Sequence, residues 1–210
     1  MSKGWKYSLL WAWLALALVA CHPKHGGLDL TGTDAFRNGD LVLRCGMGAE
    51  SRVVCERSRS TFSHIGILQQ DPATGQWNVL HAVPGESGRG PEWLKAEPIE
   101  VFFGPDRACK GAWMRVNCSD SVAERAADYC RTKVEEHVLF DNDYLLGDTT
   151  ELYCCELVWR AYLMQGIDIS GGKRYSVPEV FCDEGECIFP CNIEENETTL
   201  FIQPFKNKTL

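Results

Sequence analysis

Three residues far apart in the sequence, Cys154, His64 and His81, carry side chains that together suit nucleophilic chemistry. A cysteine thiolate is a strong nucleophile, and an imidazolium or a helix N-terminus lowers the thiol pKa from about 8.5 to roughly 3.5–7.5. A histidine within hydrogen-bonding distance activates the thiol and later protonates the leaving group. A third polar group on that histidine fixes its tautomer and orientation. The set therefore predicts acyl-transfer chemistry, provided that the fold brings the three together.

The residues around Cys154 predict a mostly buried helix. It is expected to begin after residues 148–150, where Asp or Thr suits an N-cap, and to end at Gly166. Cys154 then lies near the helix N-terminus, where unpaired amides and the helix dipole favour a negative charge. Glu156 and Arg160 are spaced as an i,i+4 ion pair.

The two histidines are expected on a β-hairpin. Residues 63–68 and 77–83 read as strands, and residues 71–75 between them give a strong turn signal. Paired residues on adjacent strands lie roughly 5 Å apart, so His81 can sit beside His64. Further elements are expected as strands at 41–43, 99–103 and 112–116 and as a helix at 121–134, in which Ser121 and Glu124 have capping-box spacing.

Each of these signals also has an ordinary structural explanation. A cysteine in a buried helix is usually there for packing, and a lone histidine is more often structural than catalytic. Cys155 competes with Cys154 as the reactive thiol but lies about 100° further round the helix. A metal site that uses His64, His81 and a cysteine is conceivable. Nothing in the spacing favours it and the sequence has no C-x2-C pair, so no metal and no cofactor are expected.

The N-terminus predicts export and a lipid anchor. Lys3 and Lys6 precede an uncharged apolar run at 9–20, which is short for a membrane span and typical of a signal peptide. The run ends at Cys21 in a sequence that resembles a bacterial lipobox, which implies that Cys21 is lipidated. An ordinary secretory signal with an incidental cysteine is the alternative. The expected organisation is a signal peptide at 1–20, a tether at 22–35 and one domain at 36–205, with a cysteine-rich extension from about 180.

Composition limits the possible partners. The 210 residues carry a net charge of −8, which argues against nucleic acid and against docking on anionic lipid through a basic patch. Eleven cysteines in an exported chain make disulfides possible. Cys182, Cys187 and Cys191 are the best candidates, because the acidic tail around them has little else to hold it. The sequence does not reveal which cysteines pair.

Four runs in order resemble a known family: residues 37–44 with a G-D-L motif, 62–67 with S-H-x-G-I, 79–83, and 153–158 with Y-C-x-E-L-V. Together they resemble the circularly permuted NlpC-type papain-like proteins, above all the YiiX/YaeF-like branch and more distantly lecithin:retinol acyltransferase. The resemblance covers about residues 36–169. It implies an α+β fold in which an antiparallel sheet packs against the central helix that bears the cysteine.

Carried over residue by residue, the resemblance makes Cys154 the nucleophile, His64 the general base and His81 the orienting residue. Two features depart from the family pattern. Cys155 replaces the usual small Ser or Thr, which leaves open which thiol reacts, and the tail from Cys182 has no family counterpart.

The function expected from these features is that of a lipid-anchored cysteine hydrolase of the bacterial cell envelope. It would cleave an amide or ester through a thioester acyl-enzyme, with a peptide, a peptidoglycan fragment or an acyl lipid as substrate. The alternatives are a lipid acyltransferase or lipase-like enzyme, and a non-catalytic envelope module that binds a lipid or another ligand. An apolar channel ending near Cys154 would favour lipid, a narrow charged cleft would favour peptide, and a sulfur far from His64 would favour binding alone.

Overall fold

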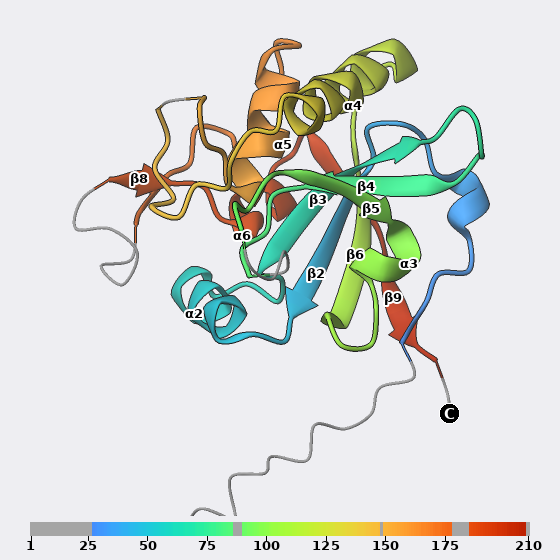
Figure 1. Cartoon of the computed structure of the whole chain (residues 1–210), viewed down its shortest axis with the longest axis horizontal. Coiled ribbons are helices and arrows are strands. Elements are labelled where there is room, and N and C mark those ends of the chain that lie inside the picture. The colour runs from blue at the N-terminus through green and yellow to red at the C-terminus, as the bar shows by residue number, and fades with distance from the viewer. Residues whose placement is uncertain (1–26, 86–89, 148, 178–184, 209–210) are drawn as a thin grey trace, which may run out of the picture.

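A seven-stranded antiparallel sheet organises the chain (Figure 1). The computed structural model describes residues 27–85, 90–147, 149–177 and 185–208. The strand order is β1-β9-β6-β2-β3-β4-β5, and β7 pairs with β8 in a small separate sheet. The strands are β1 (Leu28–Asp29), β2 (Leu41–Gly46), β3 (His64–Gln70), β4 (Trp77–His81), β5 (Lys95–Pro98), β6 (Ala108–Val116), β7 (Tyr175–Ser176), β8 (Glu186–Cys187) and β9 (Thr199–Asn207).

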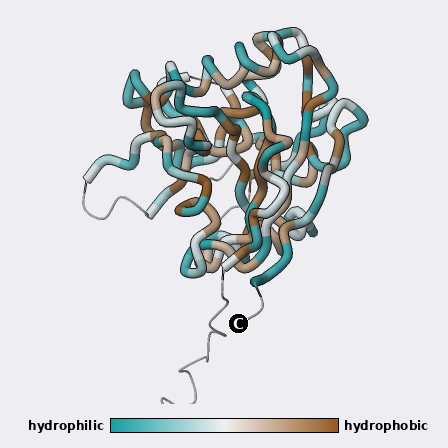
Figure 2. The backbone as a smooth tube through the Cα atoms, turned by 90° about the vertical axis from the view of Figure 1, so that its right-hand side faces the viewer, coloured by the Kyte–Doolittle hydropathy of each residue, from teal (hydrophilic) through white to brown (hydrophobic). Residues whose placement is uncertain are grey.

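The sheet buries a different hydrophobic core on each face. Successive side chains of a strand point to opposite faces, so Leu41 and Leu43 of β2 join one core while Val42 joins the other. The larger core lies between one face of the sheet and helices α2, α4, α5 and α6. The smaller core lies between the opposite face and α3. Figure 2 shows the hydrophobic stretches gathered in the middle of the molecule. The helices are η1 (Thr33–Ala35), α2 (Ala49–Ser58), α3 (Ile99–Phe102), α4 (Asp120–Glu135), α5 (Cys154–Leu163) and α6 (Pro190–Glu194).

This arrangement confirms the α+β class and an antiparallel sheet packed against the helix that carries Cys154. Helix α5 begins later than the sequence suggested, with Tyr153 rather than an Asp or Thr at its N-cap. The preceding residues are held extended instead, because the Leu152 N–H donates to the Leu139 carbonyl and Glu151 bridges Leu139. The predicted ion pair is present, with Arg160 Nε 2.9 Å from Glu156 Oε1.

Three other expectations were wrong. Residues 99–102 form helix α3 rather than a strand, because Pro98 stands at the N-cap and Ile99 and Phe102 are buried at helical spacing. Helix α4 starts at Asp120 without a side-chain cap, so Ser121 and Glu124 form no capping box. Residues 28–29, which were expected to lie in the tether, belong to the sheet, because β1 pairs with β9. Residues 1–26, and with them the predicted signal peptide, lie outside the described residues.

None of the helices in the described part of the chain is both long enough and apolar enough to cross a membrane.

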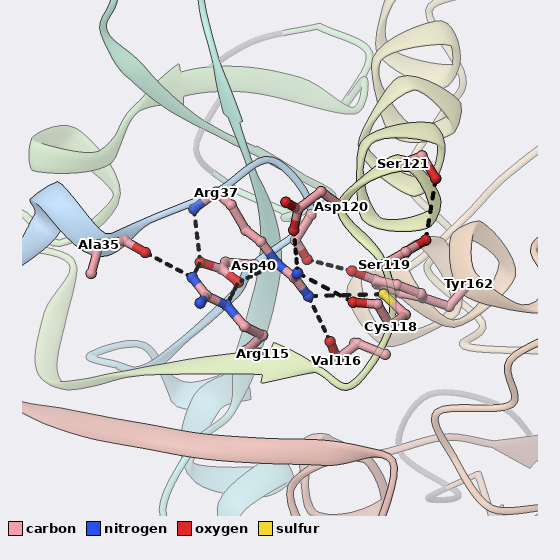
Figure 3. A network of polar contacts seen from close by, with 11 residues as sticks. Ala35, Arg37, Asp40, Arg115, Val116, Cys118, Ser119, Asp120, Ser121 and Tyr162 are labelled. Carbon is pink, nitrogen blue, oxygen red and sulfur yellow. Dashed lines mark hydrogen bonds and ion pairs between the residues drawn. The ribbon is translucent and has the colours of Figure 1, made fainter.

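The Gly39-Asp40 motif fixes the start of β2 (Figure 3). Gly39 has φ +90°, and a Cβ there would lie 2.4 Å from the Ala123 carbonyl oxygen of α4. Asp40 is fully buried and accepts two hydrogen bonds of 2.7 Å from Arg115 and one of 3.0 Å from the Arg37 backbone N–H. The Tyr162 hydroxyl of α5 donates to the Gly39 carbonyl at 2.6 Å. The motif therefore ties the central strand to helices α4 and α5.

Replacing Asp40 with Asn should destabilise the fold. The substitution leaves two arginines beside an uncharged buried amide, and breaking a buried ion pair typically costs about 3–5 kcal/mol. Because the Arg37 and Arg115 side chains are 22% and 27% exposed, water screens part of this loss. We expect the free energy of unfolding to fall by about 2–4 kcal/mol in urea denaturation. Glu136→Gln, which breaks the exposed pair with Lys133, is the control and should cost less than about 1 kcal/mol.

Candidate active site

His64, His81 and Glu97 form a diagonal line of contacts across β3, β4 and β5. His64 Nε2 lies 2.8 Å from His81 Nδ1, and His81 Nε2 lies 3.1 Å from Glu97 Oε1. The strand register explains the line: β3 pairs with β4 and β4 with β5, which puts all three side chains on one sheet face. His64 and His81 are 6% and 0% exposed and Glu97 is 7% exposed, so the line is nearly sealed from water.

Gly66 makes room for the histidine contact. A Cβ at Gly66 would come within 2.4 Å of Val79 Cγ1 and 3.2 Å of His81 Cβ. The 2.4 Å contact is too short to form, so a side chain at position 66 would displace Val79 and press against His81 on the same strand. The glycine of the S-H-x-G-I motif therefore serves the geometry of the histidine pair.

The charge on Glu97 sets the tautomers of both rings. Burial raises the pKa of Glu97, but the contact with His81 and the charge of Lys95 outweigh it and hold the pKa at about 2. Lys95 Nζ and Arg107 Nη1 lie 3.1 Å and 2.9 Å from Glu97 Oε2. An ionised carboxylate only accepts, so His81 carries its proton on Nε2, although this N–H is not well aligned with Oε1. His81 Nδ1 then accepts from His64 Nε2–H.

Because His64 Nε2 donates to His81, the Nδ1 lone pair of His64 is left to interact with Cys154. The Cys154 thiol interacts with His64 through both charge and a side-chain hydrogen bond. The pKa of Cys154 lies well below its usual value: the Cys155 thiol is the largest cause, burial opposes it, and His64 lowers the pKa further. Cys154 is also the first residue of α5, where backbone amides lack intrahelical acceptors.

The neighbouring Cys155 has the opposite character. Its sulfur lies 4.0 Å from that of Cys154, and its side chain is 1% exposed. Burial is the main cause that raises the pKa of Cys155 well above its usual value, and nearby Cys187 and Cys191 add to the effect. Cys155 therefore stays a neutral thiol that can donate toward the Cys154 sulfur. Of the two adjacent thiols, only Cys154 is suited to be the nucleophile.

Aromatic packing keeps the two histidines neutral. The ring centroids of His64 and His81 lie 5.6 Å and 5.1 Å from that of Phe102 on α3. Burial lowers the pKa of each histidine to about 4, an effect opposed by Cys154 for His64 and by Glu97 for His81. A neutral His64 can accept the thiol proton near neutral pH.

A cavity of about 520 Å³ opens beside Cys154 and His64, which is within the usual range for small-molecule sites. Charged side chains of Arg44, Glu50, Asp106 and Arg107 line part of it. Most of the other side chains that line it are apolar or aromatic, among them Met47, Val54, Phe140, Tyr144, Tyr153, Ile188, Phe189 and Pro190.

Two segments after β6 shape the apolar wall. The Asp141 carboxylate accepts backbone hydrogen bonds from Asp143, Tyr144 and Leu145, which folds the loop that presents Tyr144. The Tyr153 hydroxyl accepts a 2.7 Å hydrogen bond from the Ile188 N–H and so holds the C-terminal segment against the start of α5. The cysteine-rich extension, which has no counterpart in the family pattern, is thus part of the cavity wall.

The structure brings together Cys154, His64 and His81 as the sequence predicted. Cys21 and Cys182 lie outside the described residues, and Cys187 and Cys191 are free thiols. Glu97 was missed in the sequence. The available signal was the alternation of Lys95 and Glu97 just before a proline, which marks a short strand with one charged face, but the strand was expected four residues later.

The structure is that of an α+β protein in which a cysteine thiol at a helix N-terminus lies beside a buried pair of histidines. No protein-family model matches the sequence, and no curated protein is significantly similar to it. Among solved structures, the chain is similar to the metalloprotein YiiX from Escherichia coli O157:H7, with a TM-score of 0.63 and 17% sequence identity. The similarity covers 80% of this chain and 96% of YiiX. The chain therefore has a YiiX-like fold, and at this identity the similarity establishes the fold alone.

The word metalloprotein in that description raises the question of a metal here. Across residues 27–208, gaps aside, no group of three or more His, Cys, Asp or Glu side chains is arranged to hold a metal ion. His64 Nε2 and His81 Nδ1 face each other at 2.8 Å, so one donates a proton to the other and neither nitrogen keeps a lone pair for a metal ion. His81 Nε2 is directed to Glu97. The residues of this site therefore do not fit a metal ion.

Proposed function

We propose that the protein is a cysteine hydrolase that cleaves an ester or amide through a thioester on Cys154. The observation that carries the proposal is the continuous line Cys154–His64–His81–Glu97, buried and opening on a cavity. A neutral His64 that can accept the thiol proton, beside a Cys154 thiol whose pKa is lowered, is the arrangement that such chemistry needs. The order of His64 before Cys154, together with the YiiX-like fold, supports a circularly permuted papain-like relationship.

The line suggests how each residue acts. His64 Nδ1 takes the thiol proton while the Cys154 sulfur attacks the substrate carbonyl carbon. His64 then returns this proton to the leaving oxygen or nitrogen as the tetrahedral intermediate collapses to a thioester. A water molecule, deprotonated by the same nitrogen, attacks the thioester and regenerates the thiol. His81 holds His64 in the required tautomer, and Glu97 does the same for His81.

The start of α5 provides electrostatic stabilisation. The Cys154 N–H is the first amide of the helix and is available to an oxyanion that forms on the carbonyl carbon attacked by the same residue. Removing one such donor in other enzymes costs about 10²–10³ in kcat.

The apolar wall favours an acyl chain over a peptidoglycan fragment as the group transferred to Cys154. The Tyr144 ring packs between those of Phe140 and Tyr153, at centroid distances of 5.6 Å and 5.4 Å. After burial, the charge of nearby Cys154 contributes to raising the pKa of Tyr144, which places this aromatic wall beside the thiol. Apolar surface of this kind gains about 25 cal/mol for each Å² that a ligand buries. A peptide substrate is the alternative, supported by the charged side chains that share the cavity.

Acyl-enzyme trapping tests the function. The full chain is incubated with p-nitrophenyl acetate, octanoate and palmitate and with an activated peptide ester, quenched in acid, and mapped by mass spectrometry. We expect an acyl adduct on Cys154 with every reactive ester and faster turnover for the longer fatty acyl chains. Adducts that form faster from the peptide ester would move the substrate class to peptides. No adduct on Cys154 from any ester, with the fold intact, would favour a non-catalytic binding module instead.

Replacing Glu97 with Gln should slow the reaction without unfolding the protein. The Glu97 carboxylate lies 3.1 Å from His81 Nε2 without a well-aligned hydrogen bond, so its contribution lies at the lower end of the about 1.5–3 kcal/mol of a hydrogen bond to a charged group, roughly tenfold in rate. We expect kcat for the best ester to fall by this factor while KM changes little, because Glu97 contacts His81 rather than substrate. The pH profile of kcat should shift as well.

Lys95→Gln is the matched control for Glu97→Gln. Lys95 binds the outer oxygen Oε2 of Glu97, whereas Oε1 faces His81. We expect less than a threefold change for this variant. Equal losses in the two variants would mean that local packing, and not the contact with His81, is what matters.

We further propose that the chain is anchored in the cell envelope by lipid on Cys21, as the N-terminal pattern predicts. Several acyl chains at about 0.8 kcal/mol per buried CH2 hold a protein firmly on a membrane, which would keep the catalytic cavity near lipid substrates. Mass spectrometry of the mature N-terminus and the membrane partition of Cys21→Ser test this proposal. An unmodified Cys21 in a membrane-free protein would contradict it.

A further inference from the structure

Three cysteines outside the active site meet at one end of β2. Cys45 is on β2, Cys55 on α2 and Cys109 on β6, and each is partly buried. The Cys109 sulfur lies 3.5 Å from the Cys45 carbonyl oxygen. Burial raises the pKa of the Cys45 thiol, and the nearby thiols of Cys109 and Cys55 raise it further.

A β-bulge puts Cys109 beside Cys45. Between β2 and β6, Cys45 pairs with Lys110 and Gly46 pairs with Ala108, so Cys109 is the extra residue. A bulge sets two residues of one strand against one of the other and redirects their side chains. Cys109 is next to Lys110, the partner of Cys45, and its sulfur lies 3.5 Å from the Cys45 carbonyl oxygen, so the two cysteines are close enough for the short Cα separation of 4.4–6.8 Å that a disulfide spans.

We propose that Cys45 and Cys109 are an oxidation site at which a low-molecular-weight disulfide, such as glutathione disulfide, forms a cross-strand disulfide. Cys109 is the expected partner because it sits on the neighbouring strand of the same sheet. Cys55 is on a separate helix, and its thiol is also directed to the Thr61 carbonyl, 3.9 Å away. The disulfide would join β2 to β6 immediately before Gly46, which lines the active-site cavity.

The reaction balances in two steps. The thiolate of one cysteine attacks the small disulfide, forms a mixed disulfide and displaces one small thiolate. The thiolate of the second cysteine then attacks the protein sulfur and displaces the second small thiolate. Two electrons pass to the small disulfide, and the two protons given up by the cysteines end on the two released thiols.

This site should oxidise slowly compared with any reaction of Cys154. Burial is the main cause that raises the pKa of Cys45 to about 12 and also raises that of Cys55, so thiolate is scarce near neutral pH. The two sites can therefore be treated separately in one experiment, by alkylating Cys154 at pH 6.5 before the oxidant is added at pH 8.5.

The experiment is peptide mapping of the full chain, purified in detergent, after exhaustive treatment with glutathione disulfide. We expect a non-reduced peptide pair that joins Cys45 to Cys109, with the mass of two hydrogens lost, and a melting temperature higher by about 5–10 °C. Cys109→Ser should lose both effects. Cys118→Ser, at a partly buried cysteine elsewhere in the fold, should keep both.

Two results would overturn the proposal: a link between Cys45 and Cys55 with Cys109 left free, or Cys45 and Cys109 both still alkylated as free thiols in denaturant after the treatment. The wild-type map decides this even if a variant folds poorly. Neither result bears on the labelling of Cys154, so this inference can fail while the proposed function stands.

Discussion

Cys154→Ala should abolish acyl-enzyme formation and ester turnover, whereas Cys155→Ala should retain most of both. The two sulfurs are 4.0 Å apart, yet their environments drive their pKa values in opposite directions. Only Cys154 contacts His64 and stands first in α5. We expect turnover by Cys154→Ala to fall to the background rate, a loss of at least about 10³-fold given what an activated nucleophile contributes.

Cys155→Ala tests the supporting role of the second thiol. Its loss removes the donor nearest to the Cys154 sulfur, so the pKa of Cys154 should rise and the rate at pH 6 should fall more than the rate at pH 8. Both variants are to be compared by kcat/KM for p-nitrophenyl octanoate and by mass mapping of the adduct. An adduct that survives in Cys154→Ala and disappears in Cys155→Ala would reverse the assignment of the nucleophile.

His64→Gln should produce the second large loss. General acid–base catalysis by a positioned side chain contributes about 10²–10⁴-fold, and glutamine fills much of the same space without accepting a proton as imidazole does. We expect kcat/KM to fall within this range. Because His64 is only 6% exposed, melting temperatures must show that the variant is folded before its rate is interpreted.

His137→Gln is the matched control for His64→Gln. His137 is exposed just beyond the end of α4, where its ring packs against Trp93 and its Nδ1 lies 2.9 Å from the Glu135 carbonyl oxygen. It has no contact with the cavity wall, so we expect less than a twofold change. If a folded His64→Gln protein has the same kcat/KM as this control, His64 does not act as the general base.

The histidine pair could be predicted because it rests on local rules. A hairpin with a clear turn sets its own register, so His64 and His81 had to lie on neighbouring strands. Cys154 could be placed near a helix start from the apolar spacing that follows it. The predicted N-cap residue was wrong, because the bridge between Glu151 and Leu139 holds the chain extended up to the start of α5.

Glu97 could not be found in the same way. Its role depends on β5 pairing with β4, a contact whose register is set by tertiary packing rather than by a short turn. The apolar run after Pro98 looked like the strand, although Ile99 and Phe102 also fit one helical face, and packing over the two histidines decided the outcome. Likewise, the bulge at Cys109 depends on how β2 pairs with β6, and the contact between Tyr153 and Ile188 depends on how the C-terminal segment packs against α5. Neither feature can be predicted from a local sequence pattern.

The most direct measurement is the rate of alkylation of Cys154 by iodoacetamide as a function of pH, followed by peptide mapping in the wild type and in His64→Gln. Thiolate is lost as the pH falls through the thiol pKa, so a lowered pKa keeps the wild-type rate high at neutral pH. We predict a midpoint well below the value of about 8.5 for a free cysteine, and an upward shift in His64→Gln, which lacks the imidazole that accepts the thiol proton and then pairs with the thiolate. A wild-type midpoint at or above that of a free cysteine, unchanged in the variant, would contradict the account.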